Sequence, residues 1–370
     1  MPSTKPYASS APELTALTGS GLNLAPDDGA APLARTVADQ LGDRVGLVGA
    51  LGELDRQAGA ADVPGADSET TGVGWDAADA GDRNWWPQGL TTSADAAAVP
   101  RGGAPPGRRI LLSAWYAKQP EHSGAATRVS IVDLDAGPPG PRYAHAVLVA
   151  PHRDNPIHSR PVKVHAGGLA WCGERLLVAD TRRGVRVFDL GDLVRLPTGT
   201  RRWRGFRFVL PQCGWWRAGA HGDTRPLRWS FISLDTTEAG ALSLVAGEYA
   251  RDGDDARLAR FALDPYTGQP LQPAPVEVVR TELASMQGAV RVHGTYVVST
   301  SRGPCRRGRL WTGSPGLGPW TRHERALPVG PEDLSYEPLH RRLWTQTEYP
   351  GRRYVLSRPL PPGVRPGARR

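Results

Sequence analysis

Carboxylates beside aromatic residues are the feature of the sequence that most resembles a reactive site. The segments GEY and TEY place Glu248 and Glu348 each before a tyrosine, and PEDLSY contains the adjacent carboxylates Glu332 and Asp333. Two carboxyl groups held close together differ in pKa, so one can act as general acid and the other as base or nucleophile, as in glycoside cleavage. The pattern indicates a small-molecule-binding enzyme of the hydrolase or lyase/cyclase type. A non-catalytic ligand-binding or protein-interaction scaffold is the alternative.

Other chemistries could use the same kinds of residue. A single glutamate beside tryptophan and tyrosine faces could hold an aromatic amine and catalyse a condensation. Glu332, Asp333 and Asp180, together with backbone carbonyls, could hold Ca²⁺. His165 is the last of three histidines in PHRDNPIHSRPVKVH, whose spacing matches no standard zinc motif, and we favour it alone as an acid/base or ligand-binding group.

These residues can meet only if the fold brings distant segments together, and an internal repeat predicts that it does. The segment HAGGLAWCGERLLVADTRRGVRVFDL, residues 165–190, has the pattern of three short strands separated by turns. Four further copies begin at WPQGLTTSAD, RWSFISLDT, MQGAVRV and PEDLSYE, and a fourth strand follows the third in all but the last. Stacked four-stranded units predict an all-β fold, a β-propeller of five blades. A sixth blade requires VGLVGALGEL to be a strand, whereas its spacing favours a helix, and an antiparallel sandwich is the competing fold.

The charge distribution suggests how the chain is organised. Residues 1–80 carry a net charge of −8, residues 351–370 hold six arginines and no acid, and the remainder carries +10. We predict an acidic, partly helical or irregular N-terminal extension over 1–80, the propeller over 81–357 and a disordered basic tail over 358–370. An ordinary arginine-rich surface explains the positive body better than nucleic-acid binding, because no basic stripe is interleaved with aromatic residues.

Cysteine usage and hydropathy give expectations about the protein's surroundings. Cys172, Cys213 and Cys305 show no C-x-x-C spacing, which argues against a zinc site and favours free thiols. The N-terminus shows no leader pattern and no segment approaches 18 apolar residues. We therefore expect a cytoplasmic monomer with a small-molecule partner and neither a nucleic-acid nor a membrane partner. A secreted form is the alternative if a leader is missing.

The repeat also carries a family resemblance. The blade HAGGLAWCGERLLVADTRRGVRVFDL resembles those of NHL-like and strictosidine-synthase-like propellers, in which a strand start rich in small residues precedes a VADT-type second strand. From Gln88 to Leu356 the chain looks like a group of uncharacterised β-propeller proteins of high-GC bacteria, often labelled secreted, which share the segments GEY, QGA and GPEDLSY…LWTQTEYPGRR. The resemblance implies a propeller and no established activity.

The repeat predicts where a site would form. The first two strands of a blade are antiparallel, so the start of the first and the end of the second lie on the same face near the central axis. We expect the catalytic candidates there to be Glu332, Glu248 and His165. The ligand-binding candidates are Trp86, Gln88, Trp115, Tyr116, Asp180, Trp229, Gln287, Arg302, Asp333 and Glu348. Strand alternation sends Glu332 and Asp333 to opposite sides, with Glu332 toward the pocket and Asp333 toward neighbouring backbone amides.

Overall fold

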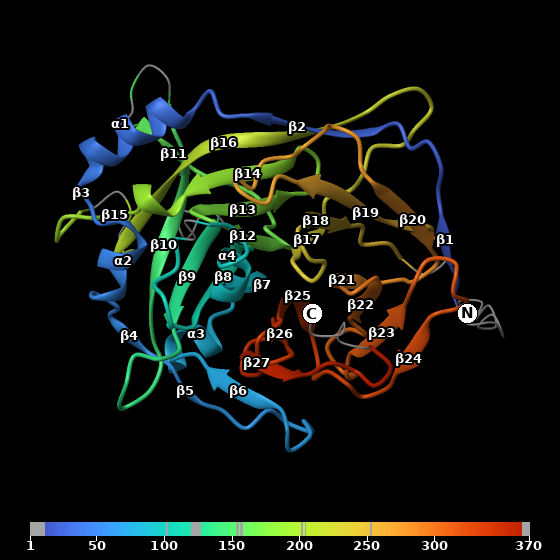
Figure 1. Cartoon of the computed structure of the whole chain (residues 1–370). Helices are drawn as coiled ribbons and strands as arrows, with labels where there is room; N and C mark the ends of the chain where they lie inside the picture. Colours follow the sequence, from blue (N-terminus) through green and yellow to red (C-terminus); the bar gives the residue numbers. More distant parts are fainter. Residues whose placement is uncertain are drawn as a thin grey trace.

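The computed structural model describes residues 12–100, 103–119, 127–152, 155, 158–200, 203, 205–251 and 254–364. Short antiparallel strands dominate this part of the chain, and they lie around a common centre (Figure 1). The fold is a β-propeller, as the repeat predicts. No helix among the described residues has both the length and the apolar character needed to cross a membrane.

Twenty of the described strands form five groups of four, and in the first four groups the strands pair in the order of the chain. The first group is β7 (Trp85–Thr92), β8 (Ile110–Ala117), β9 (Thr127–Asp133) and β10 (Arg142–Ala150). The second is β12 (Leu169–Cys172), β13 (Arg175–Asp180), β14 (Gly184–Asp189) and β16 (Phe208–Ala220). The third is β17 (Phe231–Asp235), β18 (Leu242–Gly247), β19 (Ala256–Leu263) and β20 (Glu277–Thr281).

The fourth group follows the same order, and the fifth takes its last strand from the N-terminal segment. The fourth is β21 (Met286–Val292), β22 (Thr295–Thr300), β23 (Arg309–Gly313) and β24 (Thr321–His323). The fifth is β25 (Pro331–Glu337), β26 (Arg342–Thr347), β27 (Tyr354–Pro359) and, from the N-terminal segment, β6 (Thr71–Gly74). Parallel pairing of β10 with β16 joins the first two groups into one continuous sheet. The number of separate blades therefore stays a prediction.

The five first strands, β7, β12, β17, β21 and β25, pack against one another at the centre. Their backbones approach so closely that several positions admit only glycine, of which two serve as examples. A Cβ on Gly168 would lie 2.1 Å from the backbone nitrogen of Ile232, and one on Gly288 would lie 2.5 Å from that of Leu334. The HAGG and QG segments are therefore explained by close approach of neighbouring strands at the centre.

The N-terminal segment lines the outer edges of these sheets. β1 (Leu14–Ala16) pairs with β20, β2 (Leu22–Asp27) with β16, β3 (Asp43–Arg44) with β15 (Val194–Arg195), and β4 (Arg56–Gln57) with β10. β5 (Gly59–Ala60) pairs with β6, and the short β11 (Arg160–Pro161) pairs with β10. Because β6 completes the last sheet, that sheet includes chain from before residue 81, and the boundary between extension and propeller at residue 80 stays a prediction.

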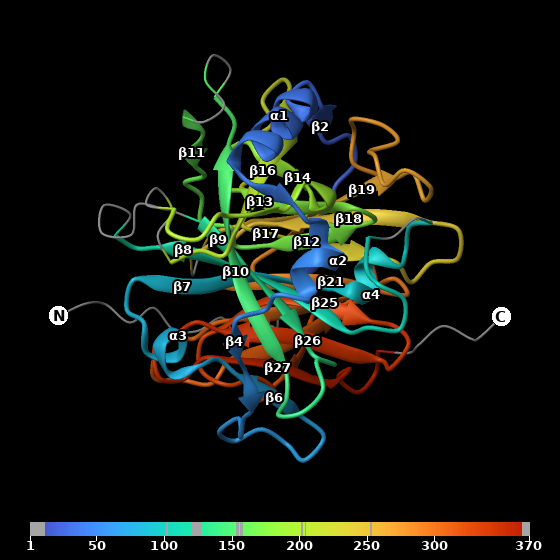
Figure 2. The same ribbon diagram turned by 90° about the vertical axis from the view of Figure 1, so that its left-hand side faces the viewer.

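The helices are short, and most of them belong to the N-terminal segment. They are α1 (Ala31–Leu41), α2 (Gly46–Leu51), α3 (Ala77–Gly81), α4 (Ser93–Ala96) and the 3₁₀ turn η2 (Leu190–Asp192). Figures 1 and 2 both place α1 beside β16 at the outside of the molecule. The expected helix in VGLVGALGEL is confirmed as α2, so this stretch supplies no blade strand.

Large aromatic residues fill the space between sheets. Trp115, Trp171, Trp216 and Trp229 are among the largest fully buried side chains. Cys172, Cys213 and Cys305 are free thiols, as predicted, and the first two are buried. At the other end, β27 reaches Pro359 and Val364 is buried, so ordered chain continues past residue 357. The predicted disorder of residues 365–370 lies outside the described residues.

Candidate functional site

Glu332 lies at the start of β25 and is a buried carboxyl group of the predicted site. Its side chain is buried, with 2% of the residue exposed, and no hydrogen bond from a described residue reaches its carboxyl oxygens. Burial, followed by the charges of Glu348 and Asp333, raises the pKa of Glu332 well above its usual range. Burial therefore favours the protonated form of this carboxyl group.

Glu348 follows β26 and is half-buried beside it. Gln88 Nε2 donates a hydrogen bond to Glu348 Oε2 at 3.4 Å, and Lys118 and Arg353 place positive charge nearby. Burial raises the pKa of Glu348, while a hydrogen bond from Tyr349, the bond from Gln88 and these two cations oppose the rise. Unlike Glu332, Glu348 therefore has several partners that favour its ionised form.

Aromatic rings surround the two carboxyl groups. Burial and the charges of Glu348 and Glu332 raise the pKa of Tyr116 to about 12, which places its hydroxyl within the field of both. The rings of Tyr116 and His165 meet edge to face with centroids 4.5 Å apart. Trp86 makes a similar contact with Tyr349 at 5.8 Å. We call this group, Glu332, Glu348, Tyr116, Trp86, Gln88, Tyr349 and His165, the axial cluster.

A carboxyl pair beside aromatic faces can transfer protons to and from a polar ligand that packs on the rings. Lys118 adds a cation, since its Nζ lies 3.1 Å from the centroid of the Trp86 ring. Trp86, Tyr116, Glu348 and Tyr349 are all partly exposed to solvent, and His165 is exposed. The cluster therefore has a solvent-facing side, and Glu332 is its buried carboxyl group.

Asp333 points away from this cluster, as strand alternation predicts. It has 0% exposed area, and its Oδ2 accepts hydrogen bonds from the backbone amides of Leu90 and Leu169, each at 3.0 Å. These amides belong to the first strands of two other groups. Asp333 holds the centre of the propeller together, and this corrects its assignment as a ligand-binding residue.

Three other candidates lie where no ligand reaches them. Trp115 and Trp229 are 0% and 1% exposed, and each packs in a hydrophobic cluster between sheets. Glu248 is ion-paired with Arg257 and Arg225 and also accepts backbone hydrogen bonds, which lower its pKa against the effect of burial. These contacts correct the expectation that Trp115 and Trp229 bind ligand and that Glu248 is catalytic, because all three are committed to the protein interior.

The remaining candidates lie near the face but outside the axial cluster. Asp180 ends β13, is 8% exposed and pairs with Arg186 at 2.9 Å. Gln287 and Arg302 are half-buried, and no hydrogen bond between the Gln287 side chain and another described residue is present. The described residues contain no group of three or more His, Cys, Asp or Glu side chains placed to hold a metal ion. Of the carboxylates expected to bind Ca²⁺, Asp180 is paired with Arg186 and Asp333 accepts hydrogen bonds from backbone amides.

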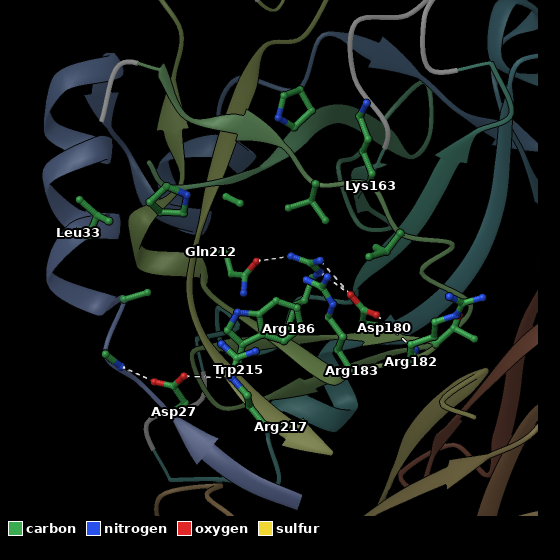
Figure 3. A pocket seen from close by; sticks show the side chains of 18 of the residues that line it. Asp27, Leu33, Lys163, Asp180, Arg182, Arg183, Arg186, Gln212, Trp215 and Arg217 are labelled. Atoms are coloured by element: carbon green, nitrogen blue, oxygen red, sulfur yellow. Dashed lines mark hydrogen bonds and ion pairs between the residues drawn. The ribbon is translucent and has the colours of Figure 1, made fainter. Parts of the chain in front are cut away.

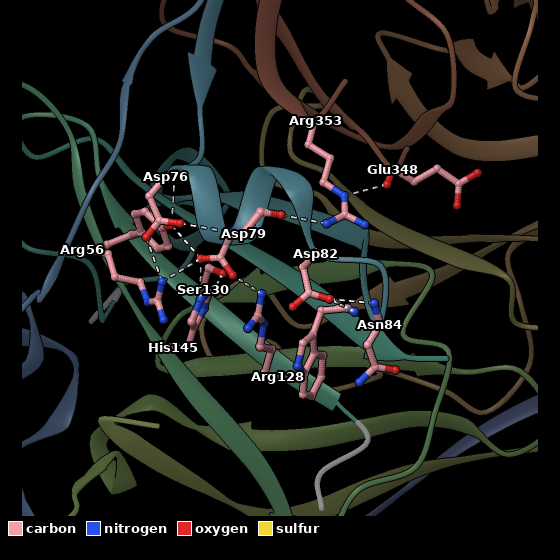
Figure 4. Close-up of polar contacts among 12 residues, drawn as sticks. Arg56, Asp76, Asp79, Asp82, Asn84, Arg128, Ser130, His145, Glu348 and Arg353 are labelled. Atoms are coloured by element: carbon pink, nitrogen blue, oxygen red, sulfur yellow. Dashed lines mark hydrogen bonds and ion pairs between the residues drawn. The ribbon is translucent and has the colours of Figure 1, made fainter. Parts of the chain in front are cut away.

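Sequence reasoning missed a buried polar network around Asp79 of α3 (Figure 4). The Asp79 carboxylate accepts hydrogen bonds from Arg128 at 2.6 Å and Tyr143 at 2.6 Å, and lies 2.9 Å from His145 Nε2. The Nδ1 of that histidine contacts Ser130 Oγ at 2.9 Å. The order Ser, His, Asp is that of a catalytic triad, but all three residues are buried and no substrate could reach the serine.

This network also supports the axial cluster. Arg353 donates to the backbone oxygen of Asp79 at 2.7 Å and to that of Glu348 at 2.8 Å. A second support is Gln346, whose Nε2 donates to the backbone oxygens of Gln88 and Gly89 at 2.9 Å. In the sequence, Gln346 stands in the segment LWTQTEY among other polar residues, so nothing marked it for this role.

Comparison of this chain with known proteins finds only distant similarity. No protein-family model and no curated protein matches the chain. A solved gluconolactonase from Xanthomonas campestris is 14% identical with a TM-score of 0.38, covering 83% of this chain and 99% of that one. The GH43_1 enzyme from Xanthomonas citri is 13% identical with a TM-score of 0.36, covering 89% and 93%. The β-propeller domain of Cps50 from Myceliophteria thermophila is 10% identical with a TM-score of 0.35, covering 76% and 98%. Similarities this low do not carry an activity over to this chain.

Proposed function

We propose that the axial cluster is the active site of a hydrolase that acts on a small polar molecule. The observation that carries the proposal is the buried Glu332 carboxyl group, which lies in the field of Glu348 and receives no hydrogen bond from the described residues. Environments that separate the pKa values of two carboxyl groups also separate their roles in proton transfer. Glu332 is the general acid, and Glu348 is the general base.

The reaction needs two proton movements. Glu332 gives its proton to the leaving group as the scissile bond breaks, and Glu348 removes a proton from the water that attacks the opposite side. Tyr116 and Trp86 supply faces on which a sugar or an aromatic ring packs. Gln88, already bonded to Glu348, keeps that carboxylate oriented.

One observation favours the alternative, a ligand-binding scaffold without catalysis. Glu332 is only 2% exposed, so little of its side chain is accessible to a ligand that packs on the rings. In that case Glu332 would be a structural residue. If the protein is a hydrolase, removal of the Glu332 proton lowers turnover. If it is a non-catalytic scaffold, the same change affects only stability.

The test uses the full chain and a panel of 4-nitrophenyl glycosides and esters. Glu332→Gln keeps the shape of the side chain but removes the proton, and we expect turnover to fall by about 10²–10⁴-fold, the usual contribution of a general acid. Glu282→Gln, at an exposed glutamate outside the cluster, is the matched control and should leave turnover unchanged. Absence of wild-type turnover across the panel, or full activity of Glu332→Gln, would overturn the proposal.

A further inference from the structure

A second concave region lies between the start of α1, the turn after β13, and β16 (Figure 3). This cavity has a volume of about 1040 Å³. Its walls come from five parts of the chain: the end of β2 with α1, the end of β10, the segment from Pro161 to His165, the β13–β14 turn with the start of β14, and one face of β16. We call it the basic pocket, because of the side chains that line it.

Positive charge dominates the basic pocket. Its cationic lining residues are Lys163, Arg182, Arg183, Arg186 and Arg217, against the two acids Asp27 and Asp180, which gives a formal net charge of +3. Figure 3 shows the arginines grouped around Asp180 and Trp215, with Lys163 on another wall.

Three of these cations have no carboxylate partner among the residues that the structure describes. Lys163, Arg182 and Arg183 are exposed, and no ion pair joins the side chain of any of them to another described residue. Within the described part of the chain, no carboxylate neutralises the charge that they add to the pocket. An arginine guanidinium presents a planar fork of N–H donors that matches phosphate or carboxylate oxygens.

The floor of the pocket is held in place by internal bonds. Arg186 is 8% exposed, and it donates to Asp180 Oδ2 at 3.0 Å and to Gln212 Oε1 at 2.7 Å. Its guanidinium lies 4.2 Å from the centroid of the Trp215 ring, and that of Arg217 lies 4.8 Å from the same ring. Arg217 pairs with Asp27 at 3.3 Å, but both side chains are about half exposed, so the pair is weak.

The start of α1 adds to the same field. Gly29, Ala30, Pro32 and Leu33 line the pocket, and no side chain caps the first turn of this helix. The amide end of a helix carries partial positive charge and favours an anion. Here it faces the same volume as five cationic side chains.

We propose that the basic pocket binds a small molecule that carries a phosphoryl group. A phosphate ester brings nearly two negative charges and three acceptor oxygens, which suits the exposed Arg182 and Arg183. Trp215 offers a partly exposed ring beside them. His165 lines this pocket and also contacts Tyr116, but phosphoryl binding does not depend on hydrolysis at the axial cluster.

The test is calorimetric titration of the full chain with pyrophosphate as the probe. We expect binding that weakens as sodium chloride is raised, because exposed charges contribute. The double substitution Arg182→Gln with Arg183→Gln lies in an exposed turn, and it should weaken binding at least about 10-fold without lowering the melting temperature, since one charge-assisted hydrogen bond lost can account for that factor. Arg142→Gln is the matched control, because Arg142 is exposed on β10 but does not line the pocket.

Each outcome of this test decides the proposal. Salt-sensitive pyrophosphate binding that the double substitution removes and Arg142→Gln retains would support it. No pyrophosphate binding by the wild type, or unchanged binding by the double variant, would overturn it. Citrate, titrated in the same way, is the polycarboxylate comparison. Binding of citrate without binding of pyrophosphate would also overturn the proposal and assign the pocket to polycarboxylates. Glu332→Gln should bind pyrophosphate as the wild type does, so failure of the hydrolase proposal would be visible separately.

Discussion

The Oδ2 atom of Asp333 accepts a hydrogen bond from the backbone amide of Leu90 at 3.0 Å, which joins the last repeat of the chain to the first. The same oxygen accepts a bond from the amide of Leu169 in the second repeat. One buried carboxyl group therefore connects three first strands at the centre of the propeller. Its neighbour Glu332, on the other side of the same strand, is left for the axial cluster.

This arrangement predicts that Asp333→Ala strongly destabilises the protein. The substitution leaves two buried amides without an acceptor, and each such group costs about 1–3 kcal/mol. Asp333→Asn, which keeps an oxygen in place, is the matched control and should melt at a higher temperature than the alanine variant. Thermal melts of both variants followed by circular dichroism check this expectation. Equal melting temperatures would mean that the two bonds contribute nothing.

A second prediction concerns the pH dependence of turnover. Glu332 must be protonated to act as general acid, so the rate should fall as pH rises through its raised pKa. Glu348 must be ionised to act as base, so the rate should also fall as pH drops through the pKa of that group. The measurement is turnover of one 4-nitrophenyl substrate across pH, with Glu282→Gln as control. A profile with no fall at high pH would exclude Glu332 as the acid.

A third prediction follows from Asp95 of α4, which is buried among Thr91 and Ser335. Burial raises the pKa of Asp95 to about 7, so the folded protein holds this proton more tightly than the unfolded chain. The stability that Asp95 contributes is therefore fully present below about pH 4 and is lost as pH rises toward 7. Asp95→Asn should remove this part of the decline. Identical pH–stability curves for variant and wild type would contradict it.

Glu248 should show the opposite pH dependence. Its pKa is lowered in the folded protein, so its contribution is present above the unfolded value near 4.5 and is lost as pH falls. Glu248→Gln deprives the buried Arg257 of its counter-charge, a change that costs on the order of 3–5 kcal/mol. Chemical denaturation at pH 7 and pH 4 measures both effects. We expect pyrophosphate binding to be unchanged, and a loss of binding would show that Glu248 acts beyond its own sheet.

The Asp79 network predicts that the N-terminal segment stabilises the propeller. Asp79→Asn leaves Arg128 and Arg56 without their shared carboxylate, and Arg128 is buried, so a loss on the order of 3–5 kcal/mol is expected. Asp62→Asn, at an exposed aspartate of the same segment, is the control. Removal of residues 1–80 should lower the melting temperature further, since it also removes β6 from the last sheet. A truncated protein as stable as the wild type would show that this segment is independent.

The sequence by itself determined the repeat and therefore the fold class. Alternation of apolar residues, turns and the recurring small residues at strand starts are local features, and each copy shows them without reference to the others. The same alternation indicated that Glu332 and Asp333 face opposite sides. The helix in VGLVGALGEL was also predictable, because its spacing is a local property.

Only the tertiary structure decided which polar residues remain available for function. Glu248 and Glu348 look alike in the segments GEY and TEY. In the structure, Glu248 is ion-paired with Arg257 and Arg225, whereas Glu348 belongs to the axial cluster. These arginines lie at other positions along the chain, so sequence spacing could not pair them with a glutamate. The same reason applies to the fourth strand of the last sheet, which is β6 from residues 71–74. Long-range pairing depends on how the sheets close around the centre, and no local pattern records it.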